Sequence, residues 1–432
     1  MVDSLVRAIP EGWNGTTTDP QALGIMVGSP PPPDKQVRFA DFSFMAYPNM
    51  RWSLNHRREL CPTVAVTRGT GPVRPLPVTA GAGIAELNLT SLDGAQMTVE
   101  DALDATFADG FLVLHHGAVV YEKYFGAGAP DRPHMAFSIT KSVTAIVALQ
   151  LVDAGLLALD RLVGSYLPQL AHSAYGDATI RDVLDMTVGV HFVEDYADFS
   201  SEVVRYGEAT GLTPVMEPSA GDSHNGIADF LASLTKEGAH GAAHHYVSPN
   251  ADVLAWLIAA DTGRSLADEF ADTIYSKIGA EHDAYFDVDG IGTPIAGTGL
   301  SLTLRDLGRI GELLRLGGRV GGEQIITPAT MNQITDSGGA HTQELFAEMT
   351  RQTGMRQHLT GWSYRNMFFH PNDADGAFAG RGIFGQTLYV NPRADIVIAR
   401  YSSSPVAANN DEDAITVPMI DAIVAHLSAR PA

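Results

Sequence analysis

The segment AFSITKSVTAIVALQLVDAG (136–155) determines how the rest of the chain is interpreted. From Ser138 onward its apolar residues recur at helical spacing, and Gly155 is a suitable C-terminal stop, so we predict a mostly buried helix. The preceding segment FLVLHHGAVVYEKYFG (111–126) has two β-rich runs around His116-Gly117, which is typical of a hairpin. Ser138 should therefore lie where a β-hairpin passes into a long buried helix.

A second pair of β-rich runs, GIFGQTLYVNPRADIVIARYSS (382–403), predicts another hairpin late in the chain. Helical patterns occur between the two hairpins, the clearest at 179–186, 227–236, 251–263 and 299–318. Strands at both ends with helices between them favour an α+β fold. We expect one antiparallel sheet flanked by helices, with an inserted helical subdomain.

Three regions follow from this pattern. Residues 1–90 are rich in Pro, Gly and Thr and contain several aromatic residues, so we interpret them as an N-terminal arm packed on the body. The α/β domain with the antiparallel sheet should comprise 91–170 and 291–432. The helical subdomain should comprise 171–290.

Composition excludes several classes of function. The 432 residues carry 28 Lys and Arg against 50 Asp and Glu, a formal net charge of −22, which opposes binding to nucleic acid and to anionic membrane surfaces. The single cysteine, Cys61, excludes a disulfide framework and a cysteine-based metal site. No apolar run of about 18 residues and no signal-peptide pattern is present, so we expect a soluble cytoplasmic protein. Its partner should be a small molecule, and a homodimer is the default assembly.

The pattern Ser138-Ile139-Thr140-Lys141 carries the first candidate chemistry. Residues three apart at the start of a helix share a face, so Lys141 should lie beside the Ser138 hydroxyl. An amine in apolar surroundings is easier to keep neutral, and it can then accept the serine proton. The helix N-terminus would add free N–H groups where an oxyanion forms. The alternative is that Ser138 only caps the helix.

A second copy of the pattern, Ser233-Leu234-Thr235-Lys236, lies at the far end of a predicted amphipathic helix. Glu237-Gly238 follows it, and an exposed lysine with a glycine is expected where a helix ends. We interpret this copy as structural.

Tyr246 and Ser248 belong to the segment HHYVSPNADVLAW, in a proline-containing loop before a helix. A loop tyrosine that points into a cleft could relay a proton to a leaving group. The alternative is a packed tyrosine, with Ser248 or Asn250 capping the next helix.

Two further stretches are candidates for substrate binding. Tyr196, in VEDYADFSSEV, could bond a substrate carbonyl or leaving nitrogen, or could be an ordinary surface aromatic. The glycines of Gly380-Arg381-Gly382-Ile383-Phe384-Gly385 would let a ligand approach a strand closely, and the Ile383 N–H could join that of Ser138 in an oxyanion hole. The alternative there is a bulge in an ordinary strand.

Other catalytic signatures are absent from the sequence. It contains no G-x-S-x-G, no H-E-x-x-H, no P-loop and no complete G-x-G-x-x-G. The His pairs 115/116 and 244/245 lack metal-like spacing with carboxylates. We therefore expect neither a metal nor a cofactor.

Taken together, these motifs resemble the serine β-lactamase and penicillin-binding-protein superfamily. Within it, the chain is most similar to the 6-aminohexanoate-dimer hydrolases, the nylon-oligomer hydrolases, over roughly residues 28–405. The resemblance is carried by Ser138-x-x-Lys141, Tyr246-Val247-Ser248, Val183 to Met186 followed by Glu194-Asp195-Tyr196, the run from Tyr246 to Trp256, Gly382-Ile383-x-Gly385-Gln386, Arg51-Trp52 and residues 62–66.

This resemblance implies a β-lactamase-like fold with the cleft between the sheet and the helical subdomain. It implies that Ser138 is the acylated nucleophile, that Lys141 is its base and that Tyr246 assists proton transfer. It also implies that Tyr196 holds the substrate amide, that Ser248 belongs to the substrate-binding residues, and that the N–H groups of Ser138 and Ile383 form the oxyanion hole. The implied activity is hydrolysis of small esters or amides, of the carboxylesterase or 6-aminohexanoate-oligomer hydrolase type.

The sequence departs from the family pattern at specific positions. The Lys-Thr-Gly motif of β-lactamases is absent, and Arg381 stands in the matching stretch. Gly207 stands where dimer hydrolases can carry an acid that meets the substrate ammonium, and Phe384 replaces a common histidine. The alternatives are a D-amino-acid peptidase or β-lactamase-like enzyme, and a non-catalytic binding protein of the same fold.

Overall fold

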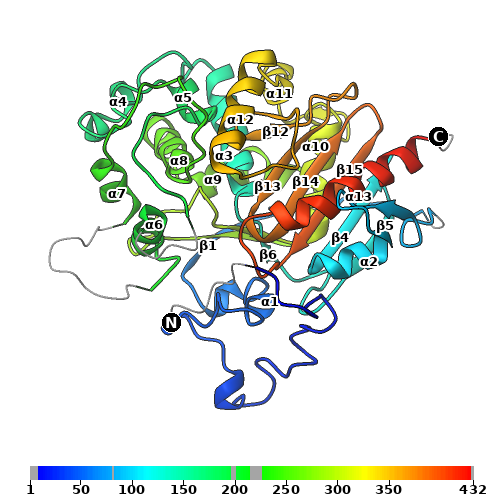
Figure 1. Ribbon diagram of the computed structural model, residues 1–432. Coiled ribbons are helices and arrows are strands. Elements are labelled where there is room, and N and C mark those ends of the chain that lie inside the picture. The colour runs from blue at the N-terminus through cyan, green and yellow to red at the C-terminus, as the bar shows by residue number, and fades with distance from the viewer. Residues whose placement is uncertain (1–7, 80–81, 196–200, 215–225, 430–432) are drawn as a thin grey trace.

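A seven-stranded antiparallel sheet forms the centre of the computed structural model (Figure 1), which describes residues 8–79, 82–195, 201–214 and 226–429. Two hairpins, one at 386–402 and the other at 108–124, build its middle and one edge, and both were predicted from the sequence. The order of strands across the sheet is β11 (Ser363–Arg365), β12 (Phe368–His370), β13 (Phe378–Gly382), β14 (Gln386–Asn391), β15 (Ile396–Ser402), β4 (Ala108–His115) and β5 (Ala118–Tyr124).

Both faces of this sheet are buried. Along β4, Phe111 and Val113 belong to one apolar cluster while Leu112 and Leu114 belong to another, because successive side chains point to opposite faces of a strand. The first cluster includes residues of α2 (Val99–Ala105) and α13 (Asn410–Ser428), which lies across the sheet in Figure 1. The second includes residues of α3 (Ile139–Asp153) and α10 (Leu304–Arg315). The sheet is therefore sandwiched between helices.

The expectation of one sheet is wrong, because a second, four-stranded sheet lies beside the first. Its strands, in order, are β1 (Thr63–Val66), β7 (Ala284–Asp287), β8 (Leu300–Leu302) and β6 (His134–Met135). These strands are two to four residues long, and β1 and β6 lie far along the chain from β7 and β8, so no local pattern indicates how the sheet is assembled. Two short hairpins complete the strands: β2 (Asn88–Thr90) with β3 (Gln96–Thr98), and β9 (Arg319–Val320) with β10 (Glu323–Gln324).

Helices make up most of the regular structure between the two hairpins. The predicted helix after Ser138 is α3, and its residues 139–149 are buried. A group of helices to the left of the sheet in Figure 1 follows it: α4 (Val163–Tyr166), α5 (Ile180–Leu184), α6 (Glu202–Thr210), α7 (Ile227–Ser233), α8 (Pro249–Thr262) and α9 (Leu266–Thr273). Two further helices, α11 (Pro328–Thr335) and α12 (Gly339–Thr353), precede β11. No helix within the described ranges is long and apolar enough to span a membrane.

The N-terminal segment is attached to the body by two buried ion pairs. Arg51, in the short helix α1 (Met50–Ser53), donates to Asp109 of β4 over 3.0 Å, and both side chains are fully buried. Arg57 donates to Asp287 of β7 through Nε and Nη2, at 3.0 and 2.7 Å. Removing one partner of such a pair costs about 3–5 kcal/mol because the other charge stays buried. These contacts fix the N-terminal segment against the edge of the site.

Candidate active site

Lys141 and Ser138 meet in a buried position at the start of α3. Lys141 Nζ lies 2.8 Å from Ser138 Oγ, and the lysine side chain is fully buried. Ser138 occupies the N-cap position of α3, but its side chain makes no capping hydrogen bond. The capping alternative therefore does not describe Ser138, since its hydroxyl is directed to the lysine.

Two more groups hold the Lys141 side-chain nitrogen. It lies 3.0 Å from Ser248 Oγ and donates to the Gly297 carbonyl over 2.7 Å. A Cβ at position 297 would lie 2.5 Å from the Tyr206 hydroxyl, so the close approach of this backbone needs glycine. The lysine is thus fixed by three oxygens from three separate parts of the chain.

Glu194 determines the direction of the Ser248 hydroxyl. Its Oε1 accepts from Ser248 Oγ over 2.8 Å, and its Oε2 accepts from the Ser248 N–H over 2.7 Å. Ser248 is the N-cap residue of α8 without a side-chain cap, and Asn250 instead accepts from the Tyr175 hydroxyl. Since the Ser248 proton points to Glu194, its oxygen accepts from Lys141.

Tyr246 covers the lysine from one side. Lys141 Nζ lies 5.2 Å from the centroid of the Tyr246 ring, and Tyr246 shares a pocket with Ser138. The Tyr246 ring also packs edge-on against Tyr364 at a centroid distance of 5.6 Å. The tyrosine is therefore adjacent to both members of the Ser138–Lys141 pair.

Asp252 lies behind this group and is buried. Burial raises the pKa of its carboxyl to about 6, although Oδ2 accepts from the Tyr206 hydroxyl over 2.6 Å and Oδ1 from the Ala296 N–H over 2.8 Å. The carboxyl group therefore changes charge near neutral pH close to Lys141.

The end of β13 approaches the start of α3 closely. A Cβ at Gly382 would lie 3.0 Å from the Ala136 carbonyl oxygen and 3.0 Å from the Ser138 nitrogen. Ile383 does not lie within a strand as expected, because Ile383–Gly385 forms a 3-10 turn between β13 and β14. The tight turn is made possible by the left-handed conformation of Phe384, with φ at 60°. Ile383 is thereby placed beside the Ser138 backbone.

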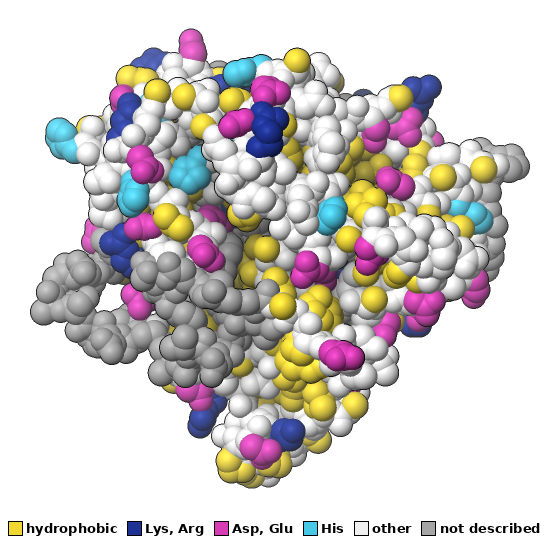
Figure 2. All heavy atoms as spheres, viewed as in Figure 1, with side chains coloured by type: hydrophobic (Ala, Val, Ile, Leu, Met, Phe, Trp, Pro, Cys, Tyr) yellow, Lys and Arg dark blue, Asp and Glu magenta, His cyan; other side chains and the backbone are white. Residues whose placement is uncertain are grey.

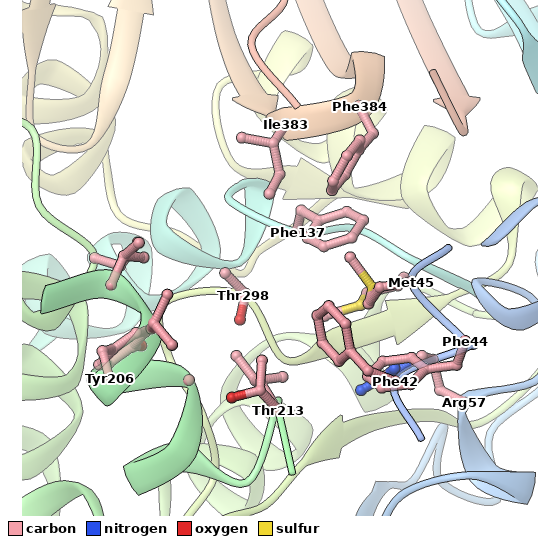
Figure 3. Close-up of a pocket in the computed structure, with 16 residues that line it drawn as sticks. Phe42, Phe44, Met45, Arg57, Phe137, Tyr206, Thr213, Thr298, Ile383 and Phe384 are labelled. Atoms are coloured by element: carbon pink, nitrogen blue, oxygen red, sulfur yellow. The ribbon is translucent and has the colours of Figure 1, made fainter. Parts of the chain in front are cut away.

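An apolar cavity of about 130 Å³ adjoins the site (Figure 3). Ile383 and Phe384 form one wall, Tyr206 of α6 lies opposite, and Phe42 and Phe44 of the N-terminal segment close a third side. Hydrophobic side chains also gather along a hollow that runs toward the N-terminal segment in Figure 2. The N-terminal segment thus contributes directly to this cavity.

Comparison with known proteins identifies relatives of the chain. The β-lactamase family model matches residues 97–417. A 6-aminohexanoate-dimer hydrolase from Paenarthrobacter ureafaciens is 31% identical over 84% of this chain and 88% of its own length. The chain belongs to the 6-aminohexanoate-dimer hydrolase family, within the β-lactamase superfamily.

Solved structures confirm the β-lactamase-like fold. A Bacillus anthracis protein assigned as a 6-aminohexanoate-dimer hydrolase superposes with a TM-score of 0.80 at 26% identity, covering 90% of this chain and 97% of that one. A family VIII carboxylesterase shares the fold at a TM-score of 0.55 and 17% identity, covering 76% of this chain and 96% of that one. The dimer-hydrolase family and the α+β fold were both predicted from the sequence.

The structure of this dimer-hydrolase family member brings most of the predicted site residues together. Ser138, Lys141, Tyr246 and Ser248 lie in one group, and Ile383 adjoins it. Tyr196 lies outside the described residues. Gly207 lines the apolar cavity. Across the described ranges, no three His, Cys, Asp or Glu side chains gather as a metal site requires.

Sequence reasoning missed the roles of Glu194, Gly297 and the aromatic residues at 42 and 44. Glu194 was part of a recognised motif, but 54 positions separate it from Ser248 and no spacing rule connects them. The cavity residues at 42 and 44 lie almost a hundred positions before Ser138, in a segment without helical or strand periodicity. Only the tertiary fold brings these groups to the site.

Proposed function

We propose that this protein is a cofactor-free serine hydrolase that cleaves small esters or amides through an acyl-enzyme on Ser138. The observation that carries the proposal is the 2.8 Å separation of Lys141 Nζ and Ser138 Oγ inside a buried site. An amine in contact with a serine hydroxyl can take its proton as the oxygen attacks a carbonyl carbon. The family supports a hydrolase.

The hydrogen-bond directions around Lys141 support its role as the base. A neutral amine has two N–H donors and one lone pair. The Gly297 carbonyl can only accept, and Ser248 accepts because its own proton goes to Glu194. These two partners use both N–H groups, so the lone pair faces Ser138.

The catalytic cycle then needs no other reactant than water. Ser138 Oγ attacks the substrate carbonyl, its proton passes to Lys141, and the N–H groups of Ser138 and Ile383 stabilise the oxyanion. The proton returns to the leaving oxygen or nitrogen with the help of Tyr246, and the acyl group stays on Ser138. A water molecule then attacks the acyl-enzyme ester and gives a proton to Lys141. Lys141 passes this proton to Ser138 Oγ as the acid leaves.

The apolar cavity supports an apolar acyl group. Its walls include Phe42, Phe44, Phe137 and Ile383, and burial of each CH₂ of an acyl chain is worth about 0.8 kcal/mol. Gly207 in this wall offers no carboxylate to a substrate ammonium. We therefore expect esters and amides of apolar acids to react faster than 6-aminohexanoate dimer.

The test compares wild type and Ser138→Ala on p-nitrophenyl hexanoate and on 6-aminohexanoate dimer. We expect ester turnover that is lost in Ser138→Ala, with the dimer slower than the ester. Full turnover in Ser138→Ala would contradict the nucleophile assignment. A dimer rate above the ester rate would contradict the substrate preference.

A further inference from the structure

A second pocket, of about 60 Å³, opens at Ser138 and shares Ile383 with the apolar cavity. Its character is different, because two arginines, Arg356 and Arg381, are among its lining residues. The predicted nucleophile therefore lies between an apolar cavity and a pocket that contains cationic groups.

The two arginines are held in different ways. Arg381 forms a buried ion pair with Asp413, so its charge is compensated. Arg356 lies over two aromatic rings, with its guanidinium carbon 4.4 Å from the Tyr246 centroid and 5.1 Å from that of Phe369. No carboxylate among the described residues forms an ion pair with Arg356. Burial lowers the pKa of Arg356, as expected for a desolvated charge without a full counter-charge.

Stacking on aromatic rings leaves the donors of Arg356 available. The rings contact the flat face of the guanidinium, whereas its five N–H groups point outward in the guanidinium plane. A planar carboxylate matches this edge and accepts two parallel hydrogen bonds from it. The pocket beside Ser138 thus presents a preformed site for a carboxylate on a bound substrate.

The position of Tyr246 indicates which half of the substrate carries this carboxylate. Lys141 Nζ and the Arg356 guanidinium both lie over the Tyr246 ring, at 5.2 and 4.4 Å from its centroid. In the proposed function Tyr246 helps to protonate the leaving group. A group held by Arg356 on the same ring therefore belongs to the leaving half, while the acyl half enters the apolar cavity.

We propose that Arg356 binds a carboxylate on the leaving half of the substrate. The preferred substrates are then amides or esters that join an apolar acid to an amino or hydroxy carboxylic acid. This inference rests on the proposed function, since it uses the acyl-enzyme on Ser138 to define the two halves.

The test compares substrates that differ only in this charge. N-hexanoyl derivatives of glycine, 4-aminobutyrate and 6-aminohexanoate are each prepared as the free carboxylate and as the neutral carboxamide, and kcat/KM is measured for both. We expect wild type to prefer the carboxylate by about 10- to 100-fold in at least one pair, as a charge-assisted bidentate contact provides. In Arg356→Gln the ratio of kcat/KM for the carboxylate to kcat/KM for the carboxamide should fall toward one, mainly because KM for the carboxylate rises. Arg356→Lys should retain part of the preference for the carboxylate.

Arg351→Gln is the matched control, because Arg351 is an exposed arginine of α12 that pairs with Glu344 and Glu348. Its ratio should equal that of wild type. The inference would be overturned if wild type showed equal kcat/KM for the carboxylate and the carboxamide in all three pairs. It would also be overturned if Arg356→Gln lowered kcat/KM for both substrates by the same factor. Turnover that persists in Ser138→Ala would instead contradict the proposed function, so the two failures are distinguishable.

Discussion

The pattern Ser-x-x-Lys occurs twice in this chain, and the two copies have different surroundings. In the first, Lys141 is fully buried at the start of α3 and lies 2.8 Å from Ser138 Oγ. In the second, α7 ends at Ser233, whose hydroxyl donates to the Phe230 carbonyl over 2.7 Å. Lys236 is 40% exposed and pairs with Asp177 rather than with Ser233. The same four-residue pattern thus gives a serine–lysine contact in one place only.

The acids near the two copies show the same contrast. Burial raises the pKa of Asp252, near Lys141, to about 6. Asp177, at the second copy, is 62% exposed, and hydrogen bonds from His240 and Lys236 lower its pKa to about 2. Desolvation dominates at the first copy and hydrogen bonding to the charged form dominates at the second. Burial at a helix start, and not the four-residue motif itself, therefore distinguishes the copy in which lysine contacts serine.

The largest difference between the copies is expected from the serines. Ser138→Ala should lower kcat by about 10⁴- to 10⁶-fold, since only binding and the oxyanion hole remain. Ser233→Ala should keep kcat within about twofold of wild type, because its hydroxyl only bonds the backbone of its own helix. Steady-state kinetics on p-nitrophenyl hexanoate measure both. If Ser138→Ala and Ser233→Ala lost kcat to a similar extent, the proposed difference between the two Ser-x-x-Lys copies would be contradicted.

The lysines should differ almost as strongly. Lys141→Ala removes the proposed base and should lower kcat by about 10²- to 10⁴-fold. Lys236→Ala removes a surface ion pair and should change the free energy of unfolding by at most about 1 kcal/mol, with normal kcat. The same ester assay measures kcat, and urea denaturation measures the free energy of unfolding. A normal kcat in Lys141→Ala would show that another group is the base.

Glu194→Gln tests the hydrogen-bond directions at the first copy. A glutamine amide can donate a hydrogen bond to Ser248 Oγ. The Ser248 hydroxyl could then donate its own proton to Lys141, and this hydrogen bond would occupy the lysine lone pair. We expect kcat to fall by about 10- to 100-fold, with little change in KM. The control is Glu237→Gln, an exposed acid next to Lys236, which should behave as wild type. An unchanged kcat in Glu194→Gln would show that the direction of the Ser248 hydroxyl is unimportant.

The smallest effect concerns stability and pH. Because the pKa of Asp252 is higher in the folded protein than in the unfolded chain, the folded state binds more protons between pH 4 and pH 6, and stability falls as pH rises. The free energy lost through this group from pH 4 to pH 7 is about 2 kcal/mol. Asp252→Asn should remove that dependence.

Asp177→Asn provides the opposite control. Its pKa is lowered on folding, so its small stabilisation is present above about pH 4 and is lost as pH falls. Urea denaturation at pH 4, 5, 6 and 7 follows both variants. If the free energy of unfolding of Asp252→Asn differed from that of wild type by the same amount at every pH, the raised pKa of Asp252 would be contradicted.

The fold was predictable where local patterns are strong. Both hairpins of the central sheet and the helix α3 were predictable, because β4, β15 and α3 are mostly buried and each contains an unbroken apolar run, at 111–114, 396–399 and 145–149. The second sheet was not predictable, since β1 pairs with β7 more than two hundred positions away. Strands of two to four residues have too few side chains to show alternation.

The site was predictable only as far as its motifs extend. The spacing of Ser138 and Lys141 on one helical turn gave their contact, and the resemblance placed Ser248 beside them. Nothing in the local sequence indicated that Glu194 orients Ser248, or that Arg356 lies on the ring of Tyr246. These contacts depend on loops whose positions are set by tertiary packing.

We propose Ser138, and not Ser233, as the nucleophile that its lysine activates. The most direct test treats wild type with a p-nitrophenyl alkylphosphonate and locates the adduct by peptide mass spectrometry. We expect one equivalent of label on Ser138, loss of esterase activity in step with labelling, and greatly slowed labelling in Lys141→Ala. Label on another residue, or full inactivation without any adduct on Ser138, would contradict it.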